Sequence, residues 1–326
     1  MSFTIPSKQK ALLVPERFAA WAITEIDVPS PGEGEVLVRS EVVGLNPADW
    51  GMQKFDFLKL KYPAILGLEA VGTVVKLGEG VTSLAVGDVP ANLTIDQAAS
   101  IPVAFGTATI GLYCPPDNRG GAGLTAPWEE GGRGKYAGKP IVILGGSTSV
   151  SQAAIQLAKM SGFSPIITTA SLKNAELLKS LGATHVIDRN LSAPEFTSVV
   201  HAITKDQIDV IFEGASSDEL QVAAYELLAS GGVYAGCRGG SGIPEAQRTP
   251  DKPVTFVFGS PFWQDRRKLC VGLYKSIPTF FESGEFKPNN VEVIPGGFSG
   301  AIIGLQRMEK GEVSAKKLVV HPPETV

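Results

Sequence analysis

The chain has 326 residues, a length that favours two domains, and its 44% hydrophobic and 19% charged residues are typical of a soluble globular protein. A net charge of −4 without a dense basic run argues against nucleic-acid binding, and no apolar run reaches the roughly 18 residues of a membrane span. The three cysteines are odd in number and widely spaced, and no apolar leader follows the N-terminal charges. We therefore expect a cytoplasmic protein without a disulfide framework.

The first hundred residues carry the pattern of short β-strands. Segments 10–14, 35–45 and 70–78 are rich in β-branched residues, and Pro and Gly separate them. Residues 96–113 then place small and apolar residues at helical spacing, with a break at Pro102. This change of pattern indicates a β-rich region followed by a different kind of domain.

Residues 114–138 combine Gly, Pro and charged residues without periodicity, which predicts a surface loop. Strands and helices alternate after it. The expected strands are 141–146, 165–171, 185–189, 209–215 and 233–237, and the expected helices are 149–162, 174–182 and 219–232. This order predicts an α/β fold with a doubly wound parallel sheet of the Rossmann type. From about residue 242 the chain is rich in loop residues, and 302–320 closes it as a helix and a strand.

The strongest chemical signal lies where the first of these strands meets its helix. Gly145 and Gly146 end the strand, and a helix rich in small residues begins about three residues later. Glycines let the backbone approach a pyrophosphate, whose charge is met by the free N–H groups of the helix N-terminus. The strict G-x-G-x-x-G spacing is absent, because Thr148 and Ser151 stand where glycines would. We predict a dinucleotide site at Gly145, Gly146, Ser147, Thr148, Ser149 and Val150.

The end of the second strand distinguishes between the two nicotinamide dinucleotides. An NAD site places an acid there to hold the ribose 2′-hydroxyl, but the chain has no carboxylate between Gly162 and Glu176. Polar and basic residues take its place and suit a 2′-phosphate: Ser171, Lys173, Asn174 and, after the third strand, Arg189. The predicted cofactor is NADPH; the alternative for Lys173 and Arg189 is that both are ordinary solvated side chains.

Several segments resemble the medium-chain dehydrogenase/reductase superfamily. They are 44–50, 67–88, 101–113, 145–159, 179–188 and 296–320. Within that superfamily the chain is similar to fungal toxin-biosynthesis-type proteins with a zinc-binding-dehydrogenase domain, which are related to the trans-acting enoyl reductases of polyketide synthases. The resemblance implies a GroES-like substrate domain from 1–100 and 246–326, and a Rossmann domain from 101–245.

The resemblance also implies roles for individual residues. Asn46 and Asp49 would act near the nicotinamide, although Asp49 is equally suited to a turn or a helix cap. Thr107 would contact the nicotinamide or its ribose, and Gly236 would lie beside the nicotinamide. Phe258 and Phe262 would bind the substrate, with core packing as the alternative. Arg266, Arg267 and Lys268 form a candidate basic patch for an acyl carrier, with a solvated helix face as the alternative.

The chain lacks the pattern of a catalytic zinc site. Where zinc alcohol dehydrogenases carry Gly-His-Glu, this chain has Gly67-Leu68-Glu69, and its three histidines (185, 201 and 321) are scattered. We expect no metal and structural or solvated roles for the histidines. Bound NADPH would then reduce an electron-poor alkene directly.

A second departure follows Asp88. In relatives, further strands separate the Gly-Asp pair from a Pro-x-Asn-Leu-Thr stretch. Here only Val89 separates Asp88 from that stretch (90–94), so the GroES-like domain is predicted to be shortened. Three functions stay open: an enoyl reductase of secondary metabolism, a quinone oxidoreductase, and an NADPH-binding pseudoenzyme. The expected partners are an unsaturated acyl substrate, free or carrier-bound, and a polyketide synthase; neither a membrane nor nucleic acid is expected.

Overall fold

The computed structural model describes residues 4–82, 92–116, 119–262 and 266–326. The chain divides into two compact units, one formed by Met1–Pro102 with Pro288–Val326 and the other by Val103–Lys287. The first boundary lies next to the predicted one. The second lies at Lys287 and not at residue 245, because the segment 246–287 supplies a strand and a helix to the second unit.

The described part of the second unit contains one parallel sheet, with strand order β11-β10-β9-β6-β7-β8. The strands are β6 (Ile141–Leu144), β7 (Ile166–Ala170), β8 (His185–Asp188), β9 (Ile208–Glu213), β10 (Leu228–Gly236) and β11 (Val254–Phe256). The order reverses between β6 and β9, and in open α/β sheets ligands bind outside the carboxyl ends of the strands at such a switch point. The predicted Rossmann sheet is confirmed.

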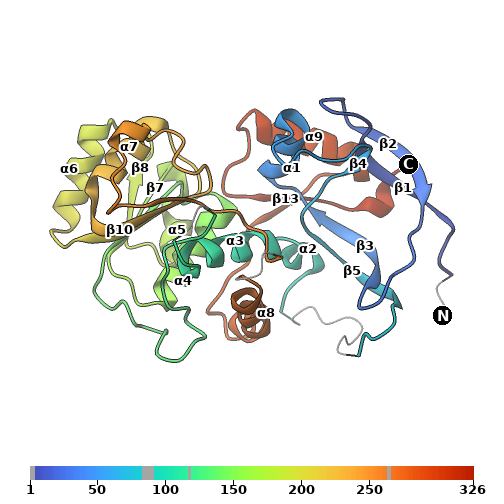
Figure 1. The fold of residues 1–326 in the computed structure, drawn as a ribbon, viewed down its shortest axis with the longest axis horizontal. Coiled ribbons are helices and arrows are strands. Elements are labelled where there is room, and N and C mark those ends of the chain that lie inside the picture. Colours follow the sequence, from blue (N-terminus) through green and yellow to red (C-terminus); the bar gives the residue numbers. More distant parts are fainter. Residues whose placement is uncertain (1–3, 83–91, 117–118, 263–265) are drawn as a thin grey trace. The chain divides into compact units, whose positions relative to one another are not determined.

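Helices cover both faces of this sheet (Figure 1). They are α3 (Pro102–Tyr113), α4 (Ser149–Met160), α5 (Ala175–Leu181), α6 (Ala193–Ile203) and α7 (Asp218–Leu227). A further helix, α8 (Arg267–Glu282), packs on α3 through Phe281 and Phe105. On one face, Val142 and Leu144 of β6 pack with Phe196 of α6 and Leu220 of α7. Because side chains alternate along a strand, Ile143 points to the opposite face. Both faces are therefore apolar, which explains the continuous hydrophobic run of β6.

Two sequence-based predictions in this unit were wrong. The helix expected over 219–232 ends at Leu227, because the chain from Leu228 onward pairs with β9 as strand β10. The region after residue 242 also contains α8, whose Leu273, Ile277 and Phe281 lie buried at helical spacing. The helix also contains Pro278, and Gly and Pro are typical loop signals.

The first unit is rich in β-structure, as expected for a GroES-like domain. Its described strands form two sheets, ordered β2-β1-β4 and β12-β13-β3-β5. The strands are β1 (Lys8–Val14), β2 (Ala22–Asp27), β3 (Val36–Gly44), β4 (Ala64–Ile65), β5 (Ala70–Leu77), β12 (Val291–Val293) and β13 (Lys317–Val320). The helices are α1 (Pro47–Phe55), α2 (Ile95–Ala98) and α9 (Gly297–Glu309). Leu12, Leu45, Leu305 and Leu318 belong to its core.

The two separate segments that form this unit share one sheet. Val319 and Val320 of β13 pair antiparallel with Gly44 and Val43 of β3, so the last strand lies beside the strand that leads into α1. The predicted deletion after Asp88 falls outside the described residues. No helix in the described part of the chain has the length and apolar character needed to cross a membrane.

Candidate functional site

The turn between β6 and α4 is built for close backbone approach. Gly145 has φ of +71°, and a Cβ there would lie 2.2 Å from the carbonyl oxygen of Ala215. A Cβ on Gly146 would lie 2.2 Å from Oγ1 of Thr168. Neither position accommodates a side chain without rearrangement, so glycine is required at both. The turn thus fits the pyrophosphate cradle that the sequence predicts.

The first turn of α4 presents hydrogen-bond donors at the carboxyl edge of the sheet. Thr148 is the N-cap residue, and its Oγ1 accepts the N–H of Ser151 at 3.2 Å. No described residue accepts the N–H groups of Ser149 and Val150, which lie at the positive end of the helix dipole. These groups fit an anion such as a pyrophosphate.

The residues predicted to bind the 2′-phosphate converge at the same edge. Asn174 donates from Nδ2 to Oγ of Ser147 at 2.9 Å, so the turn after β7 is joined to the turn after β6. Ser171 directly follows β7, and the N–H of Arg189 bonds the carbonyl of Ala170 at 3.0 Å. The segments that follow β6, β7 and β8 therefore lie together at the carboxyl edge of the sheet.

Both cations of this group are available to a ligand. Lys173 and Arg189 are exposed, and neither forms an ion pair with any described carboxylate. Lys179, by contrast, pairs with Glu176 on the outside of α5 at 3.1 Å. The structure thus fits a phosphate-binding edge, while the identity of the cofactor stays a prediction.

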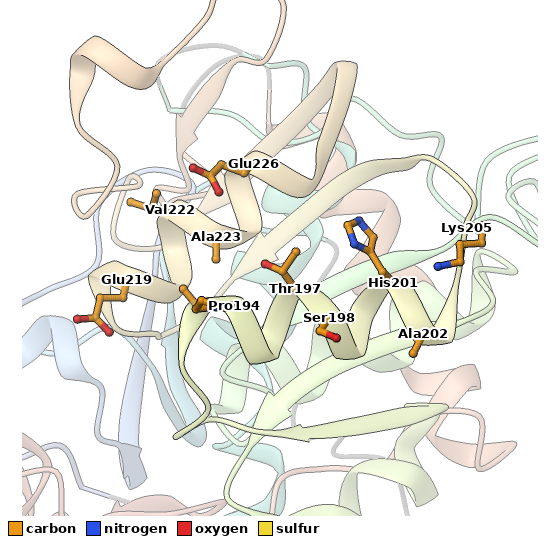
Figure 2. A pocket seen from close by; sticks show the side chains of 11 residues that line it. Pro194, Thr197, Ser198, His201, Ala202, Lys205, Glu219, Val222, Ala223 and Glu226 are labelled. Atoms are coloured by element: carbon orange, nitrogen blue, oxygen red, sulfur yellow. The ribbon is translucent and has the colours of Figure 1, made fainter.

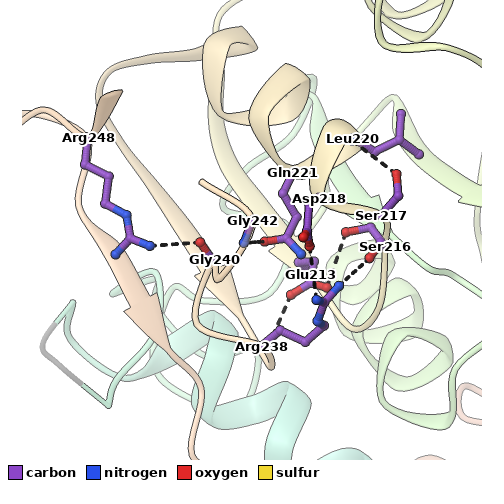
Figure 3. A network of polar contacts seen from close by, with 10 residues as sticks. All are labelled: Glu213, Ser216, Ser217, Asp218, Leu220, Gln221, Arg238, Gly240, Gly242 and Arg248. Carbon is purple, nitrogen blue, oxygen red and sulfur yellow. Dashed lines mark hydrogen bonds and ion pairs between the residues drawn. The ribbon is translucent and has the colours of Figure 1, made fainter. Parts of the chain in front are cut away.

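The other half of the sheet edge contains a residue that the sequence analysis missed. Glu213 ends β9 and lies between Leu144 of β6 and Gly236 of β10 in the register of the sheet. Its side chain is fully buried and contacts the segment around Arg238 (Figure 3). The only sequence signal was an acidic residue closing a buried strand. Gly236 ends β10, as predicted.

In the first unit, Asn46 and Asp49 belong to a buried polar cluster. The N–H of Asn46 bonds Oδ2 of Asp49 at 2.8 Å, which fits the capping role considered for Asp49. The Asn46 side chain donates to Oε1 of Glu69 at 2.9 Å and accepts from Nζ of Lys317 at 2.6 Å. Lys317 and Glu69 form an ion pair at 2.5 Å, with both side chains almost fully buried. The sequence analysis did not identify Lys317, which lies 271 residues from Asn46.

Asp49 is the perturbed carboxyl of this cluster. Burial raises its pKa to about 7, opposed by the hydrogen bond from Asn46 and the charge of Lys317. Its Oδ1 is buried without a hydrogen-bond partner among the described residues. A carboxyl that holds a proton near neutral pH is suited to proton transfer, and perturbed groups of this kind are common at functional sites.

The other substrate-side candidates lie in the second unit. Thr107 is within α3, and its hydroxyl packs against Gly259, where a Cβ would lie 2.2 Å from Oγ1. Phe258 is half-buried, whereas 91% of Phe262 is exposed. Phe262 therefore contributes nothing to the core, and its role in substrate binding stays a prediction.

The candidate carrier patch is not a patch of three surface cations. Only 4% of Arg266 is exposed, and it donates to the backbone carbonyl oxygens of Phe258, at 2.6 Å, and Arg119. Arg267 and Lys268 are exposed on α8. Arg266 thus joins three segments of the chain and is not available to a partner.

The described residues offer no ligand set for a catalytic zinc. No group of three or more His, Cys, Asp or Glu side chains in that part of the chain is arranged to hold a metal. His321 bonds Asp96 and Glu324, and these carboxylates raise its pKa. Leu68, at the position predicted for a zinc-ligating histidine, is half-exposed.

A surface groove lies between α6 and α7 (Figure 2). His201 and Lys205 of the α6 segment and Glu219 and Glu226 of α7 line it. These side chains come from the outer surfaces of two packed helices. The groove is separate from the residues predicted to bind the cofactor.

Two protein families match the chain. Residues 32–120 match the alcohol dehydrogenase GroES-like domain, and residues 149–256 match the zinc-binding dehydrogenase family. Among solved structures, the JamJ enoyl reductase is 22% identical with a TM-score of 0.69, covering 96% of this chain and 99% of that one. An alcohol dehydrogenase superfamily protein from Novosphingobium aromaticivorans is 21% identical with a TM-score of 0.73 and the same coverage. These two likenesses concern the fold.

Fungal proteins are similar over nearly the whole sequence. Trans-enoyl reductase himH of Aspergillus japonicus is 30% identical over 326 aligned positions, covering 88% of this chain and 89% of the relative. The enoyl reductase component lovC of the lovastatin nonaketide synthase of Aspergillus terreus is 26% identical and covers 98% of each chain.

Dehydrogenase azaJ of Aspergillus niger is 33% identical over 366 aligned positions, covering 96% of this chain and 99% of the relative. These positions outnumber the 326 residues of the chain, so this chain lacks residues that the relative has. With family matches in both units and a 30%-identical relative along most of its length, the chain belongs to the zinc-binding dehydrogenase family with a GroES-like domain, within the medium-chain dehydrogenase/reductase superfamily.

Proposed function

We propose that this oxidoreductase uses NADPH to reduce the conjugated double bond of an α,β-unsaturated carbonyl compound or thioester. The main support for this proposal is the arrangement of residues at the carboxyl ends of β6, β7 and β8. There the Asn174–Ser147 bond joins two turns, and the exposed cations Lys173 and Arg189 belong to the same edge. A 2′-phosphate needs such cations and polar donors, and the chain places no acid directly after β7.

When bound, NADPH would supply a hydride to the β-carbon of the alkene and leave as NADP⁺, and the α-carbon would take up a proton that comes ultimately from water. The protein binds the pyrophosphate at Gly145, Gly146 and the first turn of α4, and orients the cofactor through the segments after β7 and β8. Asn46 and Asp49 in the first unit and Thr107 in the second are the proposed substrate- and nicotinamide-facing residues. Phe258 and Phe262 are the proposed acyl-binding residues. The reaction is proposed to need no metal.

The substrate class comes from the relatives. HimH is named a trans-enoyl reductase, and lovC is named the enoyl reductase component of a polyketide synthase. We propose that this chain likewise reduces an unsaturated acyl chain, with a polyketide synthase as the source of the carrier-bound form. A cytoplasmic location suits such a partner.

Cofactor binding and turnover are tested separately. Calorimetric titration with NADPH and with NADH measures the cofactor preference, and the proposal expects tighter binding of NADPH by about tenfold or more. Loss of NADPH absorbance is then followed with an enoyl thioester, an enone and a quinone. Turnover of the thioester or enone in preference to the quinone supports the proposal.

Two results would contradict it. Preferred reduction of the quinone would identify a quinone oxidoreductase. Tight NADPH binding without turnover of any substrate would identify a pseudoenzyme.

A further inference from the structure

Glu213 occupies the centre of the carboxyl edge of the sheet. It ends β9, the first strand of the second half of the sheet, and in the β-ladder it faces the last residues of β6 and β10. In a doubly wound sheet the two halves each hold one nucleotide of the dinucleotide. The segments after β7 and β8 belong to the adenosine half, so Glu213 belongs to the nicotinamide half.

The Glu213 carboxylate joins two loops that follow neighbouring strands. Its Oε1 accepts the hydroxyl of Ser216 at 3.3 Å, in the loop after β9. Its Oε2 accepts the backbone N–H of Arg238 at 3.3 Å, in the loop after β10. Both interactions converge on one side chain (Figure 3). The carboxylate thus fixes the two loops relative to each other.

Arg238 strengthens the same connection without neutralising Glu213. Its guanidinium donates to the carbonyl oxygen of Ser216 at 2.5 Å and pairs with Asp218 at 3.1 Å. No described cation forms an ion pair with the Glu213 carboxylate. Burial raises the pKa of this carboxyl. A fully buried acid without a paired cation is costly, and an apolar residue would be the more stabilising choice for packing alone.

The loop after β10 is shaped around this carboxylate. A Cβ on Gly236 would lie 3.1 Å from Oε2 of Glu213 and 3.2 Å from the N atom of Gly240. Gly239 and Gly240 both have positive φ, at +64° and +61°. Because glycine is the most freely rotating residue, a loop of this composition needs external contacts to hold one conformation. Besides those of Glu213, the backbone of the loop receives contacts from Gln221, through the N–H of Gly242, and from Arg248, through the carbonyl of Gly240.

The loop after β9 also touches the predicted pyrophosphate turn. Ala215 lies against Gly145, and a Cβ on Gly214 would lie 2.5 Å from Oγ1 of Thr148. Ser216, which bonds Glu213, follows these two residues directly. Contacts therefore run from the β6–α4 turn through the loop after β9 to the loop after β10.

We propose that Glu213 is a positioning residue for the nicotinamide end of the cofactor: it fixes the loop 237–242 against the loop 214–218. The inference rests on the proposed NADPH function. It predicts that Glu213 contributes to binding of the nicotinamide half of the cofactor and not to binding of the adenosine half. A residue needed only for folding would affect both halves equally.

Two ligands separate these alternatives: NADPH, and 2′-phospho-ADP-ribose, which is the same molecule without nicotinamide. In Glu213→Ala, the affinity for NADPH is expected to fall about tenfold and kcat with an enone to fall at least as much. The affinity for 2′-phospho-ADP-ribose is expected to stay within about twofold of the wild type. Glu213→Gln, whose amide can accept from Arg238 N–H and donate to Ser216 Oγ, is expected to restore most of both losses.

Matched variants, tested with NADPH and with 2′-phospho-ADP-ribose, distinguish a positioning role from a role in folding alone. Arg238→Ala, at a half-exposed side chain, is expected to act in the same direction if Glu213→Ala does not fold. Glu226→Ala, an exposed acid of α7, serves as the control. The inference would be overturned if folded Glu213→Ala and Arg238→Ala lost affinity for both ligands equally, or lost affinity for neither. Failure of the wild-type protein to bind either ligand would instead refute the proposed NADPH function.

Discussion

Asn174 and Ser147 are joined by a hydrogen bond of 2.9 Å across two strand ends, although 27 positions separate them in the sequence. Ser147 belongs to the turn that would hold the pyrophosphate, and Asn174 to the turn that would hold the ribose phosphate. The bond therefore joins the two turns that are predicted to bind anions. The proposed function predicts that the neutral Asn174 amide tolerates a 2′-phosphate here, whereas a carboxylate would repel it.

Asn174→Asp tests this arrangement with almost no change of shape. In the wild type Asn174 donates to Ser147 Oγ. A carboxylate can instead accept the serine hydroxyl, but it repels a 2′-phosphate. We expect the KM for NADPH to rise about tenfold or more, while the KM for NADH changes less than about threefold. Steady-state kinetics with both cofactors measures this. A parallel rise for both would show that Asn174 acts on the shared pyrophosphate and not on the phosphate that distinguishes them.

Lys173→Ala removes an exposed cation from the same turn. Loss of one charge-assisted contact is expected to weaken NADPH binding about tenfold, or about 1.4 kcal/mol, without affecting NADH. The effect should shrink at high salt because the site is exposed. Lys179→Ala is the matched control, since Lys179 pairs with Glu176 on α5. If the two lysine variants behave alike in calorimetric titrations, Lys173 is only a solvated residue.

Gly145→Ala probes the close approach of the β6–α4 turn. The added Cβ would lie 2.2 Å from the Ala215 carbonyl oxygen at a positive φ, so both crowding and backbone strain are expected. Gly231 has φ of +82° with open space around it, so Gly231→Ala carries the strain alone. We expect a loss of about 1 kcal/mol in the free energy of unfolding for Gly231→Ala, and a clearly larger loss for Gly145→Ala. Urea denaturation measures both; equal losses would mean that the turn relaxes freely.

Asp49→Asn tests the buried carboxyl of the first unit. Because its pKa is raised from 3.8 to about 7, the folded protein retains a proton that the unfolded chain releases. The resulting stability is present at low pH and is lost as pH rises through about 7. The wild-type free energy of unfolding should therefore fall between pH 5 and pH 8 by an amount on the order of 2 kcal/mol.

The neutral amide of Asp49→Asn can still accept the N–H of Asn46, so it should remove this part of the pH dependence and raise stability at pH 8. Urea denaturation at several pH values between 5 and 8 gives the comparison. Asp27→Asn, at an exposed carboxyl that pairs with Lys8, is the control and should leave the slope unchanged. A slope in Asp49→Asn equal to that of the wild type would contradict the expected titration.

The sequence by itself determined the alternation of strands and helices, the Gly145–Gly146 turn before α4, and the absence of an acid after β7. These features depend on near neighbours in the chain, because backbone periodicity and glycine tolerance are local properties. Local signals also explain the failure at α8. The segment after residue 242 is rich in loop residues, whereas the burial of Ile277 and Phe281 depends on distant partners.

Only the tertiary structure decided how the polar residues are grouped. Lys317 contacts Asn46 from 271 residues away, and Glu213 meets Arg238 through neighbouring strand ends. In the sequence each of these residues is an ordinary polar or charged side chain. The order of strands in a sheet determines which of them become buried together, and burial removes the water that would otherwise solvate each charge separately. The chemistry of these residues therefore depends on a topology that no short segment of the chain contains.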